Sequence, residues 1–459
     1  MLAAAVLSGH ADEVTVVERD SLPAGPEPRT SLPQARHVHV LWSGGVRAFE
    51  ELLPGITDRW LAAGARRIPL PSGLVSLTAH GWVRRWPQEM QHMIACTRDL
   101  LDWVVRDHVL RLPGVTLLQR HELLGLAGSD GRVTGVRVRA PDGAEPSLDA
   151  DLVVDTGGRG SRATDWLRSL GFGGIEVDEV DSGLVYASRL YRAPDGGEGF
   201  PVVNVQADPR EPVPGRTATI VPVENGRWLV TLSGTRGGEP SSDPAEFESF
   251  ARSVRHPVVG ELIARATPLS DRVSLSRSTV NRRRYFERAP AWPDGFIVVG
   301  DAVATYNPVY AQGMSVAAQG LVELRNALRR HPPGAPGLAR RIQRALAGPV
   351  GLAWELATSQ DILYPGAVGR PARAGSALMN RYVNRLCDAA TGRARVTGAF
   401  FAVLTLSEPV TAWLRPDVVL GTLRGPGRRS AEGPPLPEAG RLGPRPERGA
   451  GPPDGIRIT

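Results

Sequence analysis

The stretch FIVVGDAVATYNPVYAQGM, residues 296–314, decides how the fold of this chain is interpreted. Phe296–Val299 is an unbroken apolar run, which predicts a short buried strand. Gly300 and Asp301 follow directly where that strand ends. The pattern therefore predicts a strand that delivers a carboxylate to its carboxyl end.

A loop that carries Pro308 leads to Gly313, and an apolar-periodic helix begins near Met314. The first N–H groups of a helix lack partners and carry the positive end of its dipole, so they attract an anion. A flavin needs both features, because its ribityl chain carries hydroxyls and its reduced ring carries negative charge. Gly-Asp alone would favour a plain strand–turn–helix with an Asp cap. The alanine that follows Gly-Asp, together with the spacing to the proline and glycine of the loop, favours a flavin site.

The basic residues are all arginine. The chain holds 54 basic and 48 acidic residues, a formal net charge of +6, and it contains no lysine. This composition excludes Schiff-base chemistry and a P-loop lysine. The Gly- and Pro-rich segment 424–459 holds seven arginines against four acidic residues, so half of the net charge lies there. We expect a disordered tail over 424–459 and no nucleic-acid partner.

Two cysteines, Cys96 and Cys387, form no CxxC motif, which favours a reducing cytoplasm over a disulfide framework. His37 and His39 form a His-x-His pair, but no carboxylate or third histidine lies at a useful spacing, so we expect no metal site. No apolar run reaches the roughly 18 residues of a membrane span. The expected location is cytoplasmic.

The first residues read as a helix from Met1, a break at Gly9, and a strand over Glu13–Val17 that ends in Glu18. In a dinucleotide-binding fold, an acid at this place accepts the ribose hydroxyls. The usual first strand and its GxGxxG turn are absent. We expect the strand and the turn to stand immediately before Met1, and to be missing because the start site is placed too late or the chain is truncated. The chain as numbered should therefore bind FAD weakly.

Between residues 175 and 290 the pattern changes to short strands separated by turn residues. This predicts an antiparallel sheet that forms a second domain, which the segment 68–92 joins. Such a sheet buries one face and can offer the other to an apolar ligand. Residues 291–330 continue the first domain, 1–174, and 331–423 are expected to form a helical C-terminal region over the cavity.

Several long segments resemble the polyene epoxidases of polyether ionophore pathways, such as those that make monensin and lasalocid. These epoxidases belong to the flavoprotein monooxygenases with a glutathione-reductase-like Rossmann domain. The segments are PQARHVHVLWSGG (33–45), ELLPG (51–55), MIACTRDLLDW (93–103), VDTGGRGS (154–161), SGTRGGEP (233–240), STVNRRR (278–284) and TSQDILYPG (358–366), together with the stretch 296–314. The resemblance covers residues 1–366.

The resemblance implies an α/β fold, α+β overall, with a Rossmann-like FAD-binding domain, an antiparallel-sheet substrate domain and a helical C-terminal region. Two of the implied FAD contacts have structural alternatives. Arg98 is alternatively a solvated arginine, and the loop that begins at Asp155 is alternatively a plain strand–turn–helix connection. Thr97 is the expected N-cap of the helix that carries Arg98. The residues expected to bind FAD are Glu18, Arg19, Arg36, His37, Arg98, Leu123, Asp155, Gly158, Gly300, Asp301, Pro308, Gly313 and Met314.

The implied activity is epoxidation of the alkenes of a linear, apolar polyketide polyene, with FAD, O2 and electrons from NAD(P)H directly or through a flavin reductase. A C4a-hydroperoxyflavin carries this chemistry, so no acid–base pair is required and no residue is expected to be catalytic. An aromatic hydroxylase of the same fold and a truncated, non-enzymatic remnant are the alternatives. A flavin halogenase is disfavoured because its catalytic lysine has no counterpart here.

Overall fold

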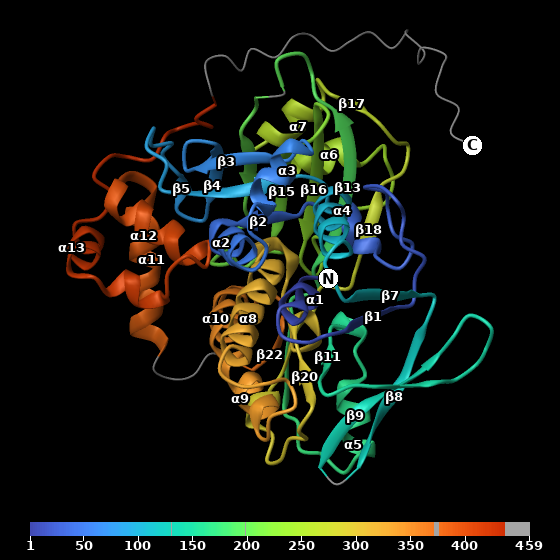
Figure 1. Ribbon diagram of the computed structural model, residues 1–459. Helices are drawn as coiled ribbons and strands as arrows, with labels where there is room; N and C mark the ends of the chain where they lie inside the picture. The colour runs from blue at the N-terminus through green and yellow to red at the C-terminus, as the bar shows by residue number, and fades with distance from the viewer. Residues whose placement is uncertain (130, 198, 371–375, 437–459) are drawn as a thin grey trace, which may run out of the picture.

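The computed structural model describes residues 1–459 except 130, 198, 371–375 and 437–459. Its elements are arranged around the long helix α8 (Gly313–Leu328), with a large sheet above it and a helical lobe to its left (Figure 1). Strand pairs and helices alternate in the remaining part. The predicted mixed α/β fold class is confirmed.

Two parallel strand pairs lie at the lower right of Figure 1. Strand β1 (Val14–Glu18) pairs with β7 (Val115–Gln119), and β11 (Val153–Asp155) pairs with β20 (Phe296–Val298). The side chains of β20 are fully buried, as its unbroken apolar sequence predicted. Because paired parallel strands end at the same edge, the loops after β11 and β20 leave the pair side by side.

A three-stranded antiparallel sheet packs beside these pairs, in the order β10 (Ser147–Asp149), β9 (Arg132–Arg139), β8 (Glu122–Ser129). The pairing of β10 with β9 is short, because the chain then enters β11 and pairs with β20 instead.

The large sheet contains strands from residues 74–82, 185–234 and 267–276. Its strand order is β17-β13-β16-β15-β14-β4-β5, and β18 pairs with β13 beside β17. The strands are β4 (Leu74–Thr78), β5 (Gly81–Trp82), β13 (Val185–Arg192), β14 (Val202–Val205), β15 (Arg216–Val223), β16 (Arg227–Gly234), β17 (Thr267–Pro268) and β18 (Ser274–Ser276).

One strand pair departs from the predicted antiparallel arrangement. Strand β14 runs parallel to β4, whereas its other neighbour β15 is antiparallel. Strands β13, β15 and β16 are neighbours in the sheet and close in sequence, which favours antiparallel pairing. Strand β4 enters from a distant part of the chain, so no hairpin fixes its direction. The sheet is therefore mixed at this edge.

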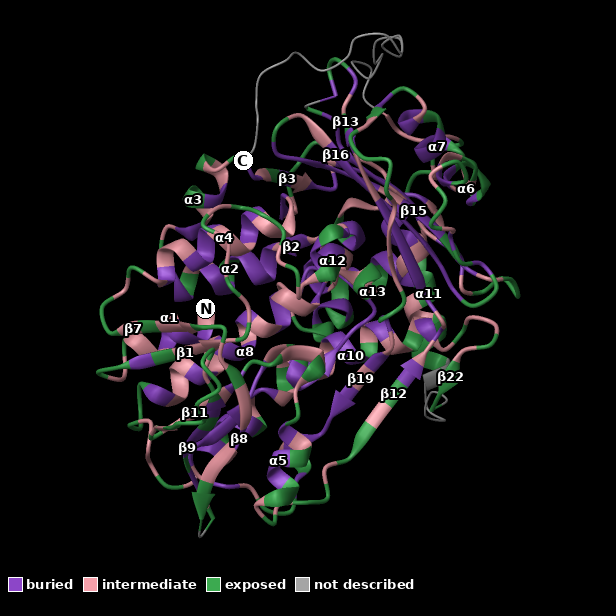
Figure 2. Cartoon of the chain, turned by 90° about the vertical axis from the view of Figure 1, so that its right-hand side faces the viewer, coloured by how far each residue is buried: buried purple, intermediate pink, exposed green. Residues whose placement is uncertain are grey.

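Helices α6 (Phe247–Ser253) and α7 (Val258–Ile263) cover one face of the large sheet (Figure 2). Val203, Ile220 and Val230 lie fully buried beneath them in the same core cluster. Side chains alternate between the faces of a strand, so the neighbouring positions point to the opposite face. That opposite face borders the cavity described below.

A second three-stranded sheet, β2-β6-β3, connects the large sheet to the helices around α8. The expected segment 68–92 is divided: β4 and β5 join the large sheet, whereas β3 and β6 belong here. The elements are β2 (Val40–Trp42), α2 (Ser43–Leu52), α3 (Ile56–Ala62), β3 (Arg66–Leu70), β6 (Gln91–Ala95) and α4 (Arg98–Val109).

A four-stranded sheet, β21-β19-β12-β22, lies beside α10. Short 3-10 helices connect several of the elements around it. The strands are β12 (Val177–Asp181), β19 (Asn281–Arg284), β21 (Ala304–Thr305) and β22 (Val368–Gly369); the remaining helices of this half are α1 (Leu2–Ser8), α5 (Ala163–Ser169), η1 (Pro33–Arg36), η2 (Gly158–Gly160), η3 (Phe286–Arg288), η4 (Gly300–Ala302) and η5 (Pro308–Tyr310).

Helices dominate the C-terminal part, as expected, and α11 (Ser376–Gly392), α12 (Ala394–Leu404) and α13 (Pro416–Arg424) form the lobe at the left of Figure 1. The other helices of this part are α9 (Leu338–Ala345), α10 (Ala347–Asp361) and the 3-10 helix η6 (Val410–Leu414). Of the expected tail, residues 425–436 lack helix and strand and contact the body through Arg428 and Ser430. Residues 437–459 lie outside the described part.

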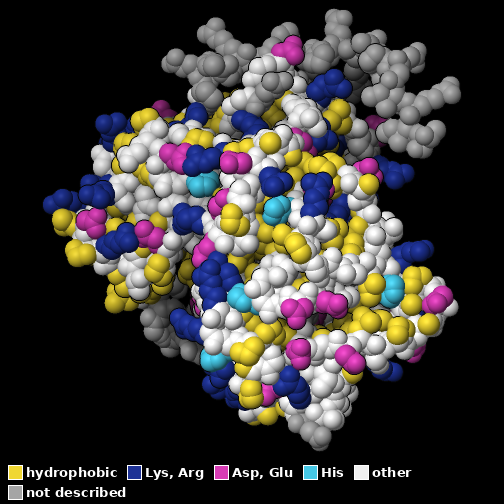
Figure 3. Space-filling view, viewed as in Figure 1, with side chains coloured by type: hydrophobic (Ala, Val, Ile, Leu, Met, Phe, Trp, Pro, Cys, Tyr) yellow, Lys and Arg dark blue, Asp and Glu magenta, His cyan; other side chains and the backbone are white. Residues whose placement is uncertain are grey.

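Basic and acidic side chains are interspersed over the face shown in Figure 3. Many of the arginines pair with a neighbouring carboxylate, as Arg139 does with Glu122 and Glu145. Within the described residues, no helix combines the length and apolarity needed to cross a membrane.

Candidate flavin and substrate site

Asp301 stands at the end of β20, as the sequence predicted. The backbone turns at Gly300 with φ +63°, a conformation that a side chain would strain. The Asp301 carboxylate accepts no hydrogen bond from any described residue and remains open to solvent. Burial among the surrounding protein atoms nevertheless raises its pKa. The carboxylate is therefore available to a ligand, and we call the solvent-accessible space around it the flavin cleft.

Two arginines face Asp301 and lower its pKa against the effect of burial. Arg98 stands in the first turn of α4, and its Nη1 contacts the Sδ atom of Met314. The Nε atom of Arg98 is buried without a partner. Arg159, in the loop after β11, donates to the carbonyl of Val280 at 2.9 Å. The sequence reasoning singled out Arg98 but missed Arg159.

The start of α8 offers free N–H groups to this cleft. Its N-cap residue, Gln312, makes no capping bond with its side chain. Instead, the Gln312 amide donates to the carbonyl of Leu404 at 3.1 Å, and its Oε1 atom is buried without a partner. Ala311, just before it, has φ +52°, which turns the chain sharply into the helix. Gly313 and Met314 open the helix, as predicted.

Thr97 caps α4, as predicted, by accepting from the backbone N–H of Leu100 at 3.4 Å. The sequence did not reveal that Glu224 in turn holds Thr97. Glu224 lies in the turn between β15 and β16 and accepts from the Thr97 N–H at 2.9 Å and its hydroxyl at 2.6 Å. Arg227 donates to the same carboxylate at 2.6 Å. The large sheet therefore fixes the helix that carries Arg98.

Replacing Glu224 with glutamine should lower the free energy of unfolding by about 1–2 kcal/mol, because a buried, charged acceptor of three hydrogen bonds becomes neutral. Urea unfolding measures the change. The exposed pair of Glu248 with Arg252 provides the control, since Glu248→Gln should cost well under about 1 kcal/mol. Equal losses in the two variants would contradict the capping role.

The remaining expected FAD contacts fall into two groups. Glu18 ends β1 but already accepts from Arg29 at 2.7 Å and from the N–H of Asp20 at 3.1 Å. Arg19 is exposed on the surface, and Leu123 lies in β8, paired with β9. None of these three is among the residues that face Asp301.

Around the loop after β11, Asp155 is buried and its carboxylate is occupied by its own loop. It accepts from the Gly157 N–H at 2.7 Å and from the hydroxyl of Ser161. Burial raises its pKa. Gly158 has φ +68° and open space around it, beside the 3-10 turn that carries Asp301. The backbone of this loop, rather than Asp155, is therefore available to a ligand.

The segment that follows Arg36 lies on the large sheet. Arg36 is exposed, whereas His37 is buried with its Nδ1 hydrogen-bonded to the hydroxyl of Ser188 at 2.7 Å. The backbone N–H of Val38 donates to Thr231 at 3.0 Å. Among the described residues, no His, Cys, Asp and Glu cluster could hold a metal.

Burial lowers the pKa of His37 from 6.5 to about 4. The folded state therefore takes up its proton only well below the pH at which the unfolded state does, and stability falls as pH drops from about 6.5 toward 4. We expect the titration of His37 to lower the free energy of unfolding by about 2 kcal/mol when the pH falls from about 7 to about 5. Urea unfolding at both values should show this loss in the wild type and a smaller one in His37→Asn. Equal losses would contradict it.

Asp361, at the end of α10, holds the loop before α8. Its carboxylate accepts from Asn281 at 2.7 Å, from Asn307 at 2.8 Å and from the hydroxyl of Tyr310 at 2.8 Å. Tyr186 donates to Asn307 at 3.0 Å. This buried network ties the loop to three other elements, and the sequence reasoning did not find it.

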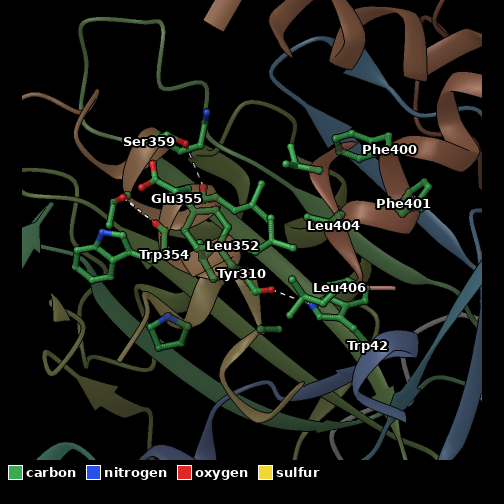
Figure 4. A pocket seen from close by; sticks show the side chains of 18 of the residues that line it. Trp42, Tyr310, Leu352, Trp354, Glu355, Ser359, Phe400, Phe401, Leu404 and Leu406 are labelled. Atoms are coloured by element: carbon green, nitrogen blue, oxygen red, sulfur yellow. Dashed lines mark hydrogen bonds between the residues drawn. The ribbon is translucent and has the colours of Figure 1, made fainter. Parts of the chain in front are cut away.

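A cavity of about 1620 Å³ lies on the other side of this loop, and Pro308 and Tyr310 line it. Figure 4 shows its wall of apolar and aromatic side chains, which come from β2, α10 and the segment after α11. The indole N–H of Trp42 donates to the carbonyl of Tyr310 at 2.9 Å. The labelled wall residues are Trp42, Tyr310, Leu352, Trp354, Glu355, Ser359, Phe400, Phe401, Leu404 and Leu406.

These residues fit a flavin. The open carboxylate of Asp301 can accept hydroxyls, and the start of α8 can stabilise negative charge. The partnerless Nε of Arg98 is a buried donor that lacks an acceptor. The backbone at Gly158 can be approached closely.

Comparison with known proteins agrees with this geometry. The model of the family described as "FAD binding domain" matches residues 1–335. The chain belongs to this family. It is thus a flavin-dependent monooxygenase with FAD as its cofactor, and enzymes of this kind use NAD(P)H and O2.

The relatives and structural neighbours are of several kinds. The chain is 30% identical to Protein Rv3254 of Mycobacterium tuberculosis over 381 residues, 81% of this chain and 80% of the relative. It is 29% identical to a kynurenine 3-monooxygenase of Salinispora arenicola over 353 residues, 74% of this chain and 72% of the relative. The solved p-nitrophenol 4-monooxygenase PnpA from Pseudomonas putida DLL-E4 shares the fold, with a TM-score of 0.61 and 16% identity over 88% of this chain and 95% of that one.

Proposed function

We propose that this monooxygenase epoxidises alkenes of a linear polyketide polyene in the biosynthesis of a polyether antibiotic. The size of the cavity carries the proposal: about 1620 Å³ exceeds the roughly 300–1,000 Å³ of pockets for drug-sized ligands. Phe400, Phe401 and Leu404 give one wall an apolar surface suited to hydrocarbon (Figure 4). A long, flexible chain would use this space, whereas a single aromatic ring would leave most of it empty.

The chain's own residues would orient and protect the reaction. When bound, FAD supplies the oxygen-transfer chemistry. Asp301 would accept hydroxyl hydrogen bonds, while the free N–H groups at the start of α8 would stabilise negative charge. Tyr310 and Pro308 would keep the loop between cofactor and cavity closed to water. For each alkene, one O2 and one NAD(P)H with a proton would give an epoxide, water and NAD(P)+.

Of the expected cofactor contacts, the structure supports Arg98, Gly158, Gly300, Asp301 and the start of α8 most directly, because these groups surround the open carboxylate. We add Arg159 to this set. Electrons could come from NAD(P)H directly or through a flavin reductase. The two cysteines are unpaired, which is in keeping with a cytoplasmic enzyme.

The alternative function is hydroxylation of an aromatic ring. It is favoured by the kynurenine 3-monooxygenases among the relatives. Such a substrate would need polar groups near the flavin to orient its ring, and Tyr186 and Asn307 lie beside the loop.

Incubation of the purified protein with FAD, NADPH, a flavin reductase and 18O2 tests both functions by mass spectrometry. A synthetic linear triene should gain labelled oxygen, whereas kynurenine and 4-nitrophenol should remain unchanged. Labelled kynurenine or nitrophenol with an unchanged triene would overturn the epoxidase proposal and establish the alternative. Protein that binds FAD but oxygenates none of the three would overturn the proposal.

A further inference from the structure

Rows of side chains cross the cavity face of the large sheet at right angles to its strands. Pairing of β4, β14, β15 and β16 places Leu74, Val202, Val221 and Leu229 in one row. Two residues along each strand, on the same face, a second row contains Ser76, Asn204, Thr219 and Thr231 and continues to Ser188 on β13. We call this second row the polar row.

The polar row is unusual for a buried surface. Ser76 is 3% exposed and Thr231 is 6% exposed, although a sheet face that packs on protein is normally apolar. Thr231 is satisfied by Ser188 at 2.6 Å, but Thr219 reaches Asn204 only at 3.4 Å. Among the described residues, none hydrogen-bonds to the hydroxyl of Ser76, which lines the cavity.

A third row repeats this character. Thr217 pairs with Ser233, and Ser233 pairs with Tyr186. Ser233 is 2% exposed, and its hydroxyl also lacks a partner in the described structure. Ser76 and Ser233 both line the cavity, so a ligand can reach their hydroxyls. Two rows of polar groups facing one cavity therefore indicate a ligand that forms hydrogen bonds with them.

The helices that border the cavity contribute a different lining. Leu352 of α10 and Phe400, Phe401 and Leu404 of α12 line it with apolar side chains (Figure 4). The cavity therefore has polar rows on the sheet, next to one apolar row, and an apolar surface formed by Leu352 and the α12 side chains. A ligand that contacts both surfaces must itself have two chemically different edges.

The polar row begins at the flavin side. The Ser188 hydroxyl meets His37, and Tyr186 on the same strand donates to Asn307 in the loop before α8. From β13 the row runs across β16, β15 and β14 to β4. At about 4.8 Å per strand, it spans roughly 19 Å away from the flavin.

We propose that the cavity binds a linear substrate that carries hydroxyl or carbonyl oxygens along one edge. The oxygens lie on the polar row from β13 toward β4, and the hydrocarbon edge lies against α10 and α12. This inference rests on the proposed function and adds to it the place where the oxygens of the chain bind, which makes the polar row a determinant of substrate specificity. One alkene then lies at the β13 end, beside the loop that borders the flavin.

The test compares two synthetic trienes of equal length, one a plain hydrocarbon and one with secondary hydroxyls at regular intervals along one edge. Quenching of tryptophan fluorescence in the FAD-loaded protein gives the Kd of each. The hydroxylated triene should bind at least about tenfold more tightly to the wild type. Equal affinity of the two trienes would overturn the inference.

Variants of the polar row sharpen this test. Thr219→Val and Asn204→Leu should weaken binding of the hydroxylated triene about three- to tenfold and leave the hydrocarbon triene unchanged. Thr219→Ser keeps the hydroxyl and should restore the preference, which separates the row from a general effect on folding. Thr116→Val, an exposed threonine on β7, is the matched control and should change neither affinity. A preference unaltered in both row variants would overturn the inference.

Product analysis keeps this inference separate from the proposed function. Preferential binding of the hydroxylated triene without any epoxide would support the oxygenated ligand and count against epoxidation. Epoxidation of both trienes with equal affinity would support epoxidation and overturn the role of the polar row.

Discussion

Asp301→Ala should weaken FAD binding by roughly 1.5–3 kcal/mol, which is roughly a 10- to 150-fold rise in Kd. The carboxylate ends a fully buried strand, has no hydrogen-bond partner among the described residues, and stands open in the cleft. A cofactor hydroxyl that loses this charged acceptor finds no substitute nearby, because the adjacent groups are the donors Arg98 and Arg159.

Titration of the purified protein with FAD, followed by flavin fluorescence, measures the effect. Asp301→Asn keeps one acceptor oxygen and should give an intermediate Kd. Asp165→Ala removes an exposed carboxylate that pairs with Arg168 on α5, and it should leave the Kd unchanged. An unchanged or tighter Kd in Asp301→Ala would show that the two arginines attract the cofactor at this point and that Asp301 opposes it.

Asp361→Ala should lower the free energy of unfolding by roughly 2–4 kcal/mol. The substitution leaves the buried Asn281 and Asn307 and the half-buried Tyr310 without this acceptor. Part of this loss is offset, because burial raises the pKa of Asp361 and removing the carboxylate relieves that desolvation. The loop before α8 should also loosen, so FAD binding should weaken although Asp361 lies outside the flavin cleft.

Urea unfolding and FAD titration of the same variant test both parts. Asp178→Ala is the matched control, because Asp178 also accepts a tyrosine hydroxyl, from Tyr285 at 2.8 Å. Its other partner, Arg370, is largely exposed, so this change should cost under about 1 kcal/mol. Similar losses in the two variants would refute the special role of Asp361 in holding the loop.

The features found from sequence alone are local ones. One short stretch contains Phe296–Val299, Asp301 and the start of α8 in succession. Thr97 likewise caps the helix that begins at the next residue, Arg98. Apolar period, glycine position and capping chemistry are enough to predict such features. The strands of the large sheet were found for the same reason.

The features that were missed join residues far apart in the chain. Glu224 reaches Thr97, and Asp361 reaches Asn281 and Asn307, across many intervening elements. No spacing rule connects such partners. A carboxylate within a helix that packs in the core was the available signal for Asp361, because a buried charge needs partners. The polar row was equally hidden, since it requires the register between strands.

The flavin cleft is built from two ends of an insertion. Strands β11 and β20 pair in parallel, yet the large sheet's strands β13 to β18 lie between them in the chain. Closing so long a loop is entropically unfavourable, so this pair should form late in folding, after the inserted sheet has brought its ends together. Substitutions that destabilise the sheet under α6 and α7 should therefore reduce the fraction of chains that retain FAD. Excess FAD should rescue them, because the cofactor binds the folded state alone.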